Sequence, residues 1–280
     1  SGDEPGVFKE IYDFADCLGF TIACLGKTPV FSPAIKEATP DSVYAEAIAG
    51  SHSPKMFCSF KDGSKTQIEL TSSANACGLV PDVRGGHNKE ATLESLSQLY
   101  RLKKDGGILN SYGVVDCCQG VYNQDGSVDL VRSTVPGVFG VITTDHPIIS
   151  RDAKRYLRKY FRGEGPTFVL YRPYHLCNIE TPISLARAVL FNEPTCTPLG
   201  MFTEVITLAK RDLKPGEVLD GSGGYTVYGR MEKYAIARKE NLLPFSLAQN
   251  IKMVKGVKKD EPLAYSDVQL DESSFILKLI

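Results

Sequence analysis

Hydrophobic side chains near the start of the chain recur at helical spacing. The recurring residues are Val7, Ile11, Phe14, Ala15 and Leu18. Gly19 follows them as a stop signal, and the run FTIACLG at 20–26 is short, apolar and rich in residues that favour strands. The pattern therefore predicts a helix over about 7–18 and then a buried strand, which together make half of an α/β unit.

Helical and strand patterns alternate through the next 170 residues. Helical spacing or helix boundary signals occur at 39–50, 63–76, 93–100, 146–161 and 179–194. Short runs rich in β-branched and aromatic residues occur at 113–122, 135–145 and 167–175. This order predicts an α+β domain with a mixed sheet and helices on one face.

The last eighty residues contain an internal echo. Segments 209–221 and 254–267 share a strand end, a basic residue, a turn, a glutamate, one variable residue and a leucine. Two such half-units predict a small β module of pseudo-twofold character. We place a domain boundary near residue 200, ahead of this module.

The stretch 54–82 concentrates ionisable side chains among small residues. Asp62 precedes a predicted helix that runs to about residue 76 and can accept hydrogen bonds from its first N–H groups. In that helix Asp62, Lys65, Glu69 and Ser72 lie on one stripe. Lys65 and Glu69 are either a surface ion pair worth about 0.3–0.5 kcal/mol, or a pair that faces a cleft. In a cleft, lysine can polarise a carbonyl oxygen, and carboxylates can orient hydroxyls or hold a cation.

Two further candidates lie at the start of the chain. Gly2, Asp3 and Glu4 form a glycine-flanked turn with two carboxylates before the first helix, which is either a helix cap or a ligand-binding turn. Lys27 follows the first strand at its carboxyl end, where open α/β sheets place their ligands. The alternative for Lys27 is a solvated loop lysine.

Loop and strand-end residues complete the set of candidates. His87 stands beside Asn88 in a glycine-rich loop, as a ligand contact or as a surface residue. Arg172 and His175 lie at a strand end flanked by tyrosines. The sheet would bring both to its edge, although Arg172 is equally a candidate ion-pair partner for a carboxylate at the edge of the core.

Composition excludes several classes of partner. With 32 basic and 33 acidic side chains, the formal net charge of -1 offers no excess for nucleic acid or for an anionic membrane. No apolar run approaches the ~20 residues that span a bilayer. The eight cysteines have neither CxxC pairs nor zinc-site spacing, which favours a reducing compartment, and we expect a cytoplasmic protein.

Six separated blocks resemble one family. GDEPG, SFKDGSKTQIELTSSANACGLVPD, GGHNKEAT, DGGILN, LYRPYHL and the closing LKPGEVLDG…NLLP…DEPLAYSDVQL stand in the family's order. The chain thereby resembles homoserine-dehydrogenase-like oxidoreductases with a C-terminal SAF domain, a group that includes enzymes similar to 1-deoxy-xylulose 5-phosphate reductoisomerase.

The resemblance implies a division of the chain and the position of its site. Residues 1–30 would be the end of a dinucleotide-binding (Rossmann) domain that lies mostly upstream, 31–200 a catalytic and oligomerisation domain, and 201–280 a SAF-like β-clip. No GxGxxG or GxxxxGK[ST] motif is present. Cofactor contacts would come from Gly2, Asp3, Glu4 and Lys27.

The family's block DGTKT…E…AN matches Asp62, Lys65, Glu69 and Asn75. Lys65, Glu69 and Lys27 would then be catalytic. Substrate would be bound by Asp62, Asn75, Arg172, His175 and His87. Glu69 and Asp62 would be ligands of a Mg²⁺ or Mn²⁺ ion, if one is used.

Two hypotheses about function follow. The first is an NAD- or NADP-dependent oxidoreductase that acts on a small polyhydroxylated or phosphorylated carbonyl or alcohol compound and works as a homo-oligomer. This hypothesis includes a reductoisomerase activity. The second is a non-catalytic or dehydratase-related sugar-acid binding module built on a SAF domain. The second is favoured by the turn GKTPVF at 26–31, which lacks the second lysine and both asparagines of the family's GKGKNN-type turn.

Overall fold

The chain forms two units, each assembled from segments that are separated in sequence. A computed structural model describes residues 2–129, 131–157, 163, 165–271, 273 and 275–279. The first unit comprises residues 1–33 and 72–202, and the second comprises 34–71 and 203–280. Two of these breaks lie near the boundaries expected at 30 and 200, and the third interrupts a helix. The three-domain division itself stays a prediction.

The first unit begins with the predicted helix and strand. Helix α1 spans Glu4–Cys17 and strand β1 spans Thr21–Lys27. Val7, Phe8 and Ile11 are buried, and so are the last six residues of β1. Phe14 and Leu18, which the helical pattern placed inward, are 50% and 45% exposed. The helix–strand unit is therefore confirmed, with a narrower buried face than its spacing predicted.

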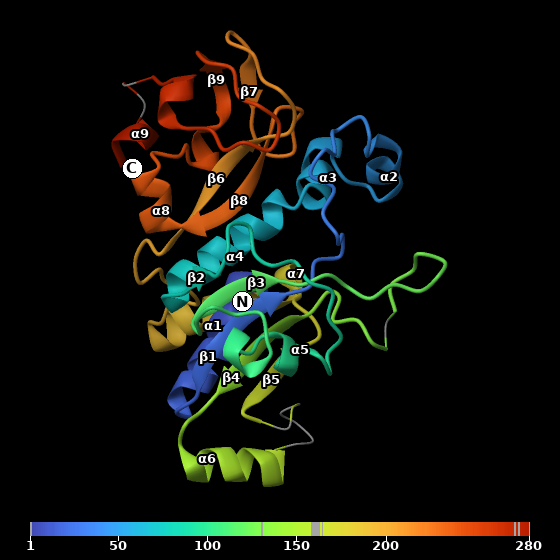
Figure 1. The fold of residues 1–280 in the computed structure, drawn as a ribbon, viewed down its shortest axis with the longest axis vertical. Helices are drawn as coiled ribbons and strands as arrows, with labels where there is room; N and C mark the ends of the chain where they lie inside the picture. The colour runs from blue at the N-terminus through green and yellow to red at the C-terminus, as the bar shows by residue number, and fades with distance from the viewer. Residues whose placement is uncertain are drawn as a thin grey trace. The chain divides into compact units, whose positions relative to one another are not determined.

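A five-stranded mixed sheet organises this unit (Figure 1). Its order is β2-β3-β1-β4-β5, and the other strands are β2 (Val80–Pro81), β3 (Val114–Cys117), β4 (Val138–Thr143) and β5 (Thr167–Arg172). β1 pairs parallel with β3 and antiparallel with β4, which pairs antiparallel with β5. The carboxyl ends of β3, β1 and β5 therefore lie at the same edge of the sheet.

The residues packed on β4 show that both faces of the sheet are covered. Phe139 packs on Tyr100, with ring centroids 5.5 Å apart, next to helix α5 (Leu96–Leu99). A Cβ on the next residue, Gly140, would lie 2.6 Å from Ile11 of α1. Adjacent strand residues point to opposite faces, so α1 and the α5 segment lie on different sides. The expectation of helices on one face only was wrong, because strand periodicity does not reveal which segment covers each side.

The remaining helices of this unit depart in length from the sequence patterns. Within the helix predicted at 93–100, only the four residues of α5 are helical. Leu96 and Tyr100 are nevertheless fully buried. α6 spans Pro147–Asp152 and continues as a π turn over Ala153–Leu157, while residues 158–161 of the predicted helix lie outside the described residues. α7 spans Cys177–Ala186, continuing as a π turn over Arg187–Phe191.

Helix α4 (Ser64–Cys77) runs from the second unit into the first. The carboxylate of Asp62 accepts the N–H of Ser64 at 2.8 Å, which confirms the predicted cap. After Cys77, Gly78 adopts φ +70 and Leu79 N–H bonds back to the carbonyl of Ala74 at 2.9 Å. Asp62 and Gly78 thus set the two ends of the helix through local signals, as the sequence indicated.

The second unit is built from short strands and small helices. β6 (Thr203–Ala209) pairs with β8 (Val227–Lys233), and a three-stranded sheet has the order β10-β9-β7. The bounds are β7 Val218–Asp220, β9 Gln249–Met253, β10 Val268–Gln269, α2 Tyr44–Ala49, α3 Pro54–Lys61, α8 Tyr234–Lys239 and α9 Phe275–Leu279. Its main core includes Leu219, Leu243, Met253 and Leu263.

The two echo segments of this unit pair with each other. Leu213 and Val257 stand at equivalent positions of 209–221 and 254–267 and exchange both backbone hydrogen bonds, at 2.8 and 3.2 Å. Such reciprocal pairing is what a pseudo-twofold arrangement requires.

No helix in the described part of the chain is long and apolar enough to cross a membrane.

Gly26 of β1 has no room for a side chain. A Cβ there would collide with the ring of Phe139. We expect Gly26→Ala to lower the free energy of unfolding by about 1–3 kcal/mol, because the added methyl group would overpack the core. Urea denaturation followed by circular dichroism measures this change. Gly256→Ala is the control, since its nearest neighbour would lie at 3.4 Å; equal losses in both variants would contradict the packing argument.

Candidate active site

One row of cross-strand partners marks the carboxyl edge of the sheet. Lys27 of β1 is level with Cys117 of β3 and with Val138 of β4, and Val138 is level with Arg172 of β5. This register brings Lys27 and Arg172 to the same end of the sheet, as the sequence analysis expected. It also adds Asp116, the neighbour of Cys117, which that analysis did not select.

Lys27 is buried and forms an ion pair with Glu4 in the first turn of α1. The lysine is therefore not the solvated loop residue of the alternative interpretation. Gly2 has φ +86, and a Cβ there would lie 2.6 Å from the carbonyl oxygen of Leu176. Glycine thus permits the N-terminal turn to approach the loop that follows β5.

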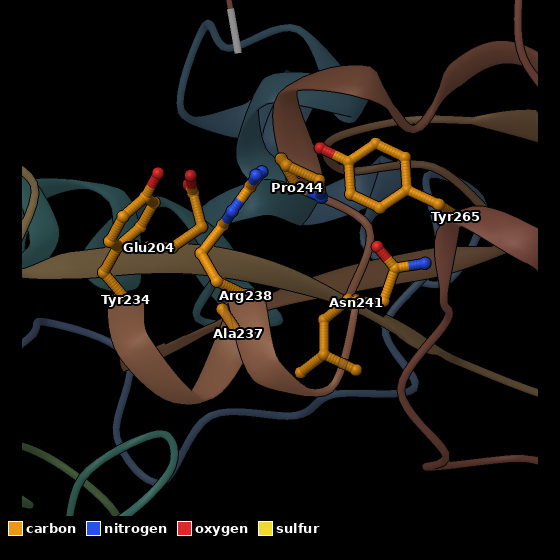
Figure 2. Close-up of a pocket in the computed structure, with 8 residues that line it drawn as sticks. Glu204, Tyr234, Ala237, Arg238, Asn241, Pro244 and Tyr265 are labelled. Atoms are coloured by element: carbon orange, nitrogen blue, oxygen red, sulfur yellow. The ribbon is translucent and has the colours of Figure 1, made fainter.

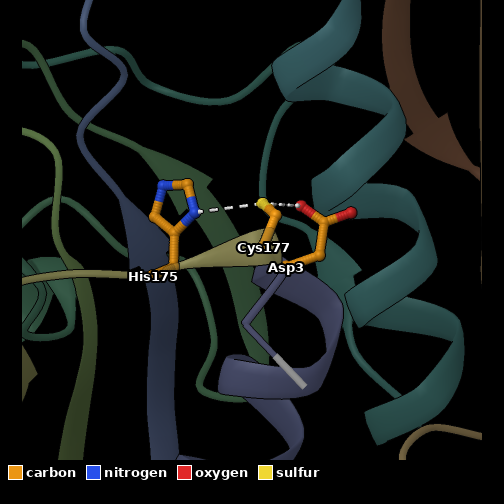
Figure 3. Close-up of side chains that lie close together, drawn as sticks. All are labelled: Asp3, His175 and Cys177. Atoms are coloured by element: carbon orange, nitrogen blue, oxygen red, sulfur yellow. Dashed lines mark hydrogen bonds between the residues drawn. The ribbon is translucent and has the colours of Figure 1, made fainter. Parts of the chain in front are cut away.

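His175 adjoins the same carboxylate. Its Nε2 lies 3.3 Å from Glu4 Oε1, and its Nδ1 lies 3.9 Å from Cys177 Sγ. Cys177 Sγ in turn lies 3.5 Å from Asp3 Oδ1. Figure 3 shows the sulfur of Cys177, the first residue of α7, between the imidazole of His175 and the carboxylate of Asp3. Burial and the nearby Asp3 raise the pKa of the Cys177 thiol.

Arg172 is held by two carboxylates. Its guanidinium bonds Glu10 Oε2 at 2.9 Å and forms an ion pair with Glu180, which also accepts the N–H of Leu176 at 2.8 Å. These contacts match the structural interpretation of Arg172, as an ion-pair partner at the edge of the core. They fix the loop that carries His175.

A second group of titratable residues lies on the β3 side of the edge. The backbone N–H of His87 donates to Asp116 Oδ1 at 2.8 Å, and its Nε2 lies 2.8 Å from Asp82 Oδ2. Asp82 also accepts the backbone and side-chain N–H groups of Asn110, each at 3.0 Å. His87 is thus part of a hydrogen-bonded network that joins two carboxylates.

The environments of these carboxylates push their pKa values apart. Burial raises the pKa of Asp116 to about 7, against the charge of His87 and the backbone N–H groups that favour ionisation. Burial acts in the same sense on Asp82, but hydrogen bonds from Asn110 and His87 outweigh it and hold its pKa below 3.8. Two carboxyl groups with diverging pKa values are the usual basis for one acid and one base.

The candidate site residues in α4 and just before it lie in separate environments. Lys65 and Glu69 form an ion pair, with side chains 39% and 7% exposed. Asp62 is fully buried and pairs with Lys210 at 2.8 Å, and Lys210 also donates to the carbonyls of Ala38 and Gly224. Asn75 accepts the N–H of Phe202 at 2.8 Å. The structure does not bring Asp62 toward the Lys65–Glu69 pair.

The donor set suggested for magnesium or manganese does not fit. Glu69 is paired with Lys65, and Asp62 is paired with Lys210, whose other contacts also lie inside the second unit. Hard divalent cations need carboxylates whose charge is available together with further oxygen ligands. We derive no step through such a cation.

A small cavity lies in the second unit (Figure 2). Glu204, Arg238 and Tyr265 are among its lining residues, and its volume is about 10 Å³. That volume holds about one water molecule. Burial raises the pKa of Glu204, but the space is too small for a sugar or a nicotinamide.

Sequence reasoning missed several residues of the site. Asp116 stands inside the apolar run GVVDCC, and a carboxylate in a buried strand is the signal that would have identified it. Asp82, Glu180 and Cys177 have no such local signal, because their roles depend on partners distant in sequence.

Comparison with known families gives one result. The family model described as "Oxidoreductase DRL, catalytic domain" matches residues 2–181. A search of curated proteins found no match. The matched range contains Lys27, His87, Asp116, Arg172 and His175, and therefore the whole sheet edge described above.

The raised pKa of Asp116 predicts a pH-dependent stability. The unfolded carboxyl ionises near 3.8 and the folded one near 7, so the folded state binds more protons between these values. Stability attributable to Asp116 is present below pH 3.8 and is lost as the pH rises through 7. In Asp116→Asn that loss disappears, so the variant gains stability relative to the parent from pH 4 to pH 7. Urea titrations across this range measure it; a constant difference would contradict the assignment.

Proposed function

The chain belongs to the family of the DRL oxidoreductase catalytic domain, and from this premise we propose an NAD- or NADP-dependent oxidoreductase acting on a small polyhydroxylated or phosphorylated carbonyl or alcohol compound. We propose further that the chain is homoserine-dehydrogenase-like and has a reductoisomerase-like activity. This part of the proposal rests on the resemblance of the six sequence blocks. The observation that carries it in the structure is the buried Lys27 at the carboxyl edge of the sheet.

Lys27 is suited to protonate or polarise a substrate oxygen. Its ammonium is desolvated and paired with Glu4, so its position is fixed before substrate arrives. When bound, the nicotinamide supplies or accepts the hydride. Lys27 would hold the proton at the carbonyl oxygen on which negative charge develops.

The neighbouring groups support orientation and proton exchange. His175, held by Glu4, is placed to contact a hydroxyl or an anionic group of the substrate. Asp116 changes protonation near neutral pH and connects through His87 to the ionised Asp82. This network would exchange a proton with solvent after each turnover.

We also propose that 201–280 form a SAF-like β-clip. The reciprocal pairing of Leu213 with Val257 supports a pseudo-twofold β module. We propose that 1–30 are the end of a nucleotide-binding domain, as the resemblance of the sequence blocks implies.

Calorimetric titration with NADH and NADPH tests the cofactor assignment. We expect binding by a chain extended upstream to include a nucleotide-binding domain, and little or no binding by the 280 residues alone, because the phosphate-binding fingerprint is absent from them. Absence of binding in both chains would overturn the nicotinamide assignment and favour the sugar-acid binding module.

Substitution of two lysines tests the catalytic assignment. Lys27→Arg keeps the charge opposite Glu4, and we expect it to lower kcat by about 10²–10⁴-fold, because guanidinium does not transfer its proton. NADPH consumption with 1-deoxy-xylulose 5-phosphate, on the extended chain, is the first assay. Lys9→Arg in α1 is the matched control. If activity is lost only in Lys65→Ala, the catalytic role belongs to Lys65. Full activity in both Lys27→Arg and Lys65→Ala would contradict the mechanism.

A further inference from the structure

Three side chains with different donor atoms converge beside the Lys27–Glu4 pair. Asp3 Oδ1, His175 Nδ1 and Cys177 Sγ lie within 4.8 Å of one another. Asp3 precedes α1 and Cys177 opens α7, and both are exposed, while His175 is partly buried. An oxygen, a nitrogen and a sulfur are therefore presented together and are accessible from solvent.

The imidazole is oriented with one nitrogen toward this cluster. His175 Nε2 faces the carboxylate of Glu4 at 3.3 Å, and Glu4 is itself held by Lys27. In the neutral ring we assign the proton to Nε2, where Glu4 accepts it, which leaves the Nδ1 lone pair directed to Cys177. A carboxylate behind a histidine is the arrangement that fixes ring orientation and raises basicity in metal sites.

Two of the three separations between donor atoms are close to the edges of a tetrahedral zinc site. Zn–S bonds of ~2.3 Å and Zn–N or Zn–O bonds of ~2.0–2.1 Å place sulfur about 3.6 Å from either lighter donor. The observed separations from Cys177 Sγ are 3.5 Å to Asp3 Oδ1 and 3.9 Å to His175 Nδ1. The third separation, between the Asp3 and His175 donors, is within 4.8 Å, so these two side chains would move toward each other as the ion binds. Figure 3 shows the sulfur lying between them.

We propose that Asp3, His175 and Cys177 form a binding site for a divalent cation of the zinc class. A mixed sulfur, nitrogen and oxygen set selects Zn²⁺ over Mg²⁺ or Ca²⁺, which prefer oxygen donors alone. On binding, the thiol proton passes to solvent and a metal–thiolate bond forms. Three protein ligands leave the fourth tetrahedral position for water or another small ligand.

Binding of Co²⁺ to the metal-free 280-residue chain is the direct test. We expect one equivalent to bind and to produce the thiolate-to-cobalt charge-transfer band in the near ultraviolet. Zn²⁺ should then displace the cobalt stoichiometrically, and competition with a chromophoric chelator gives its Kd. Neither measurement uses substrate or nicotinamide, so the result is independent of the oxidoreductase activity.

Variants at the ligands separate this site from nonspecific metal binding. Cys177→Ser removes the sulfur donor at an exposed position, and we expect it to abolish the charge-transfer band. The affinity for Zn²⁺ should fall by at least ~100-fold, which exceeds the ~10–100-fold loss typical of changes to residues that only contact a ligand. His175→Gln should weaken it similarly. Cys17→Ser, at an exposed thiol in the same unit, is the control and should bind as the parent does. A band that survives Cys177→Ser, or the lack of any saturable site in the parent chain, would overturn the proposal.

Discussion

The buried ion pair of Lys27 and Glu4 is the constraint on which the candidate site depends. It joins the end of β1 to the first turn of α1, 23 residues apart in sequence. Removing two charges from water costs several kcal/mol per ion, and good geometry is needed to offset that cost. The contact of His175 with Glu4 ties the loop after β5 to the same pair. One charge pair therefore sets the relative positions of three segments.

Lys27 and Lys210, both buried, show how similar sequence signals lead to different structural roles. Besides its ion pair with Asp62, Lys210 donates to the carbonyls of Ala38 and Gly224, and all of these groups belong to the second unit. Such a lysine stabilises the link between Asp62, at the start of α4, and the end of β6. Lys27 lies instead at the carboxyl edge of a mixed sheet, where ligands commonly bind. Position in the sheet distinguishes them more than burial does.

Sequence patterns predicted the elements whose causes are local. The helical repeat before Gly19, the apolar run at 20–26 and the Asp62 cap depend on neighbouring residues, and each is present. The helix at 93–100 is shorter than predicted, because its apolar residues pack against the sheet whether or not the backbone is helical. Long-range pairing was inaccessible: no local feature places 34–71 with 203–280, or packs helices on both faces of the sheet.

The same distinction applies within the candidate site. Lys27, His87, Arg172 and His175 were identified because polar residues at strand ends and in glycine-rich loops are conspicuous. Glu4 was identified as well, but Glu180, Asp82 and Asp116 were not, since they acquire their roles only when the register aligns the strand ends.

The divergent pKa values of Asp82 and Asp116 show what that alignment adds. Both carboxylates contact His87 and both accept N–H groups, but Asp116 lies inside a buried strand, where burial outweighs its donors. In Asp82 the donors, which include the backbone and side chain of Asn110, outweigh burial and favour the ionised form. The sheet edge thus gives identical side chains different pKa values, through their positions.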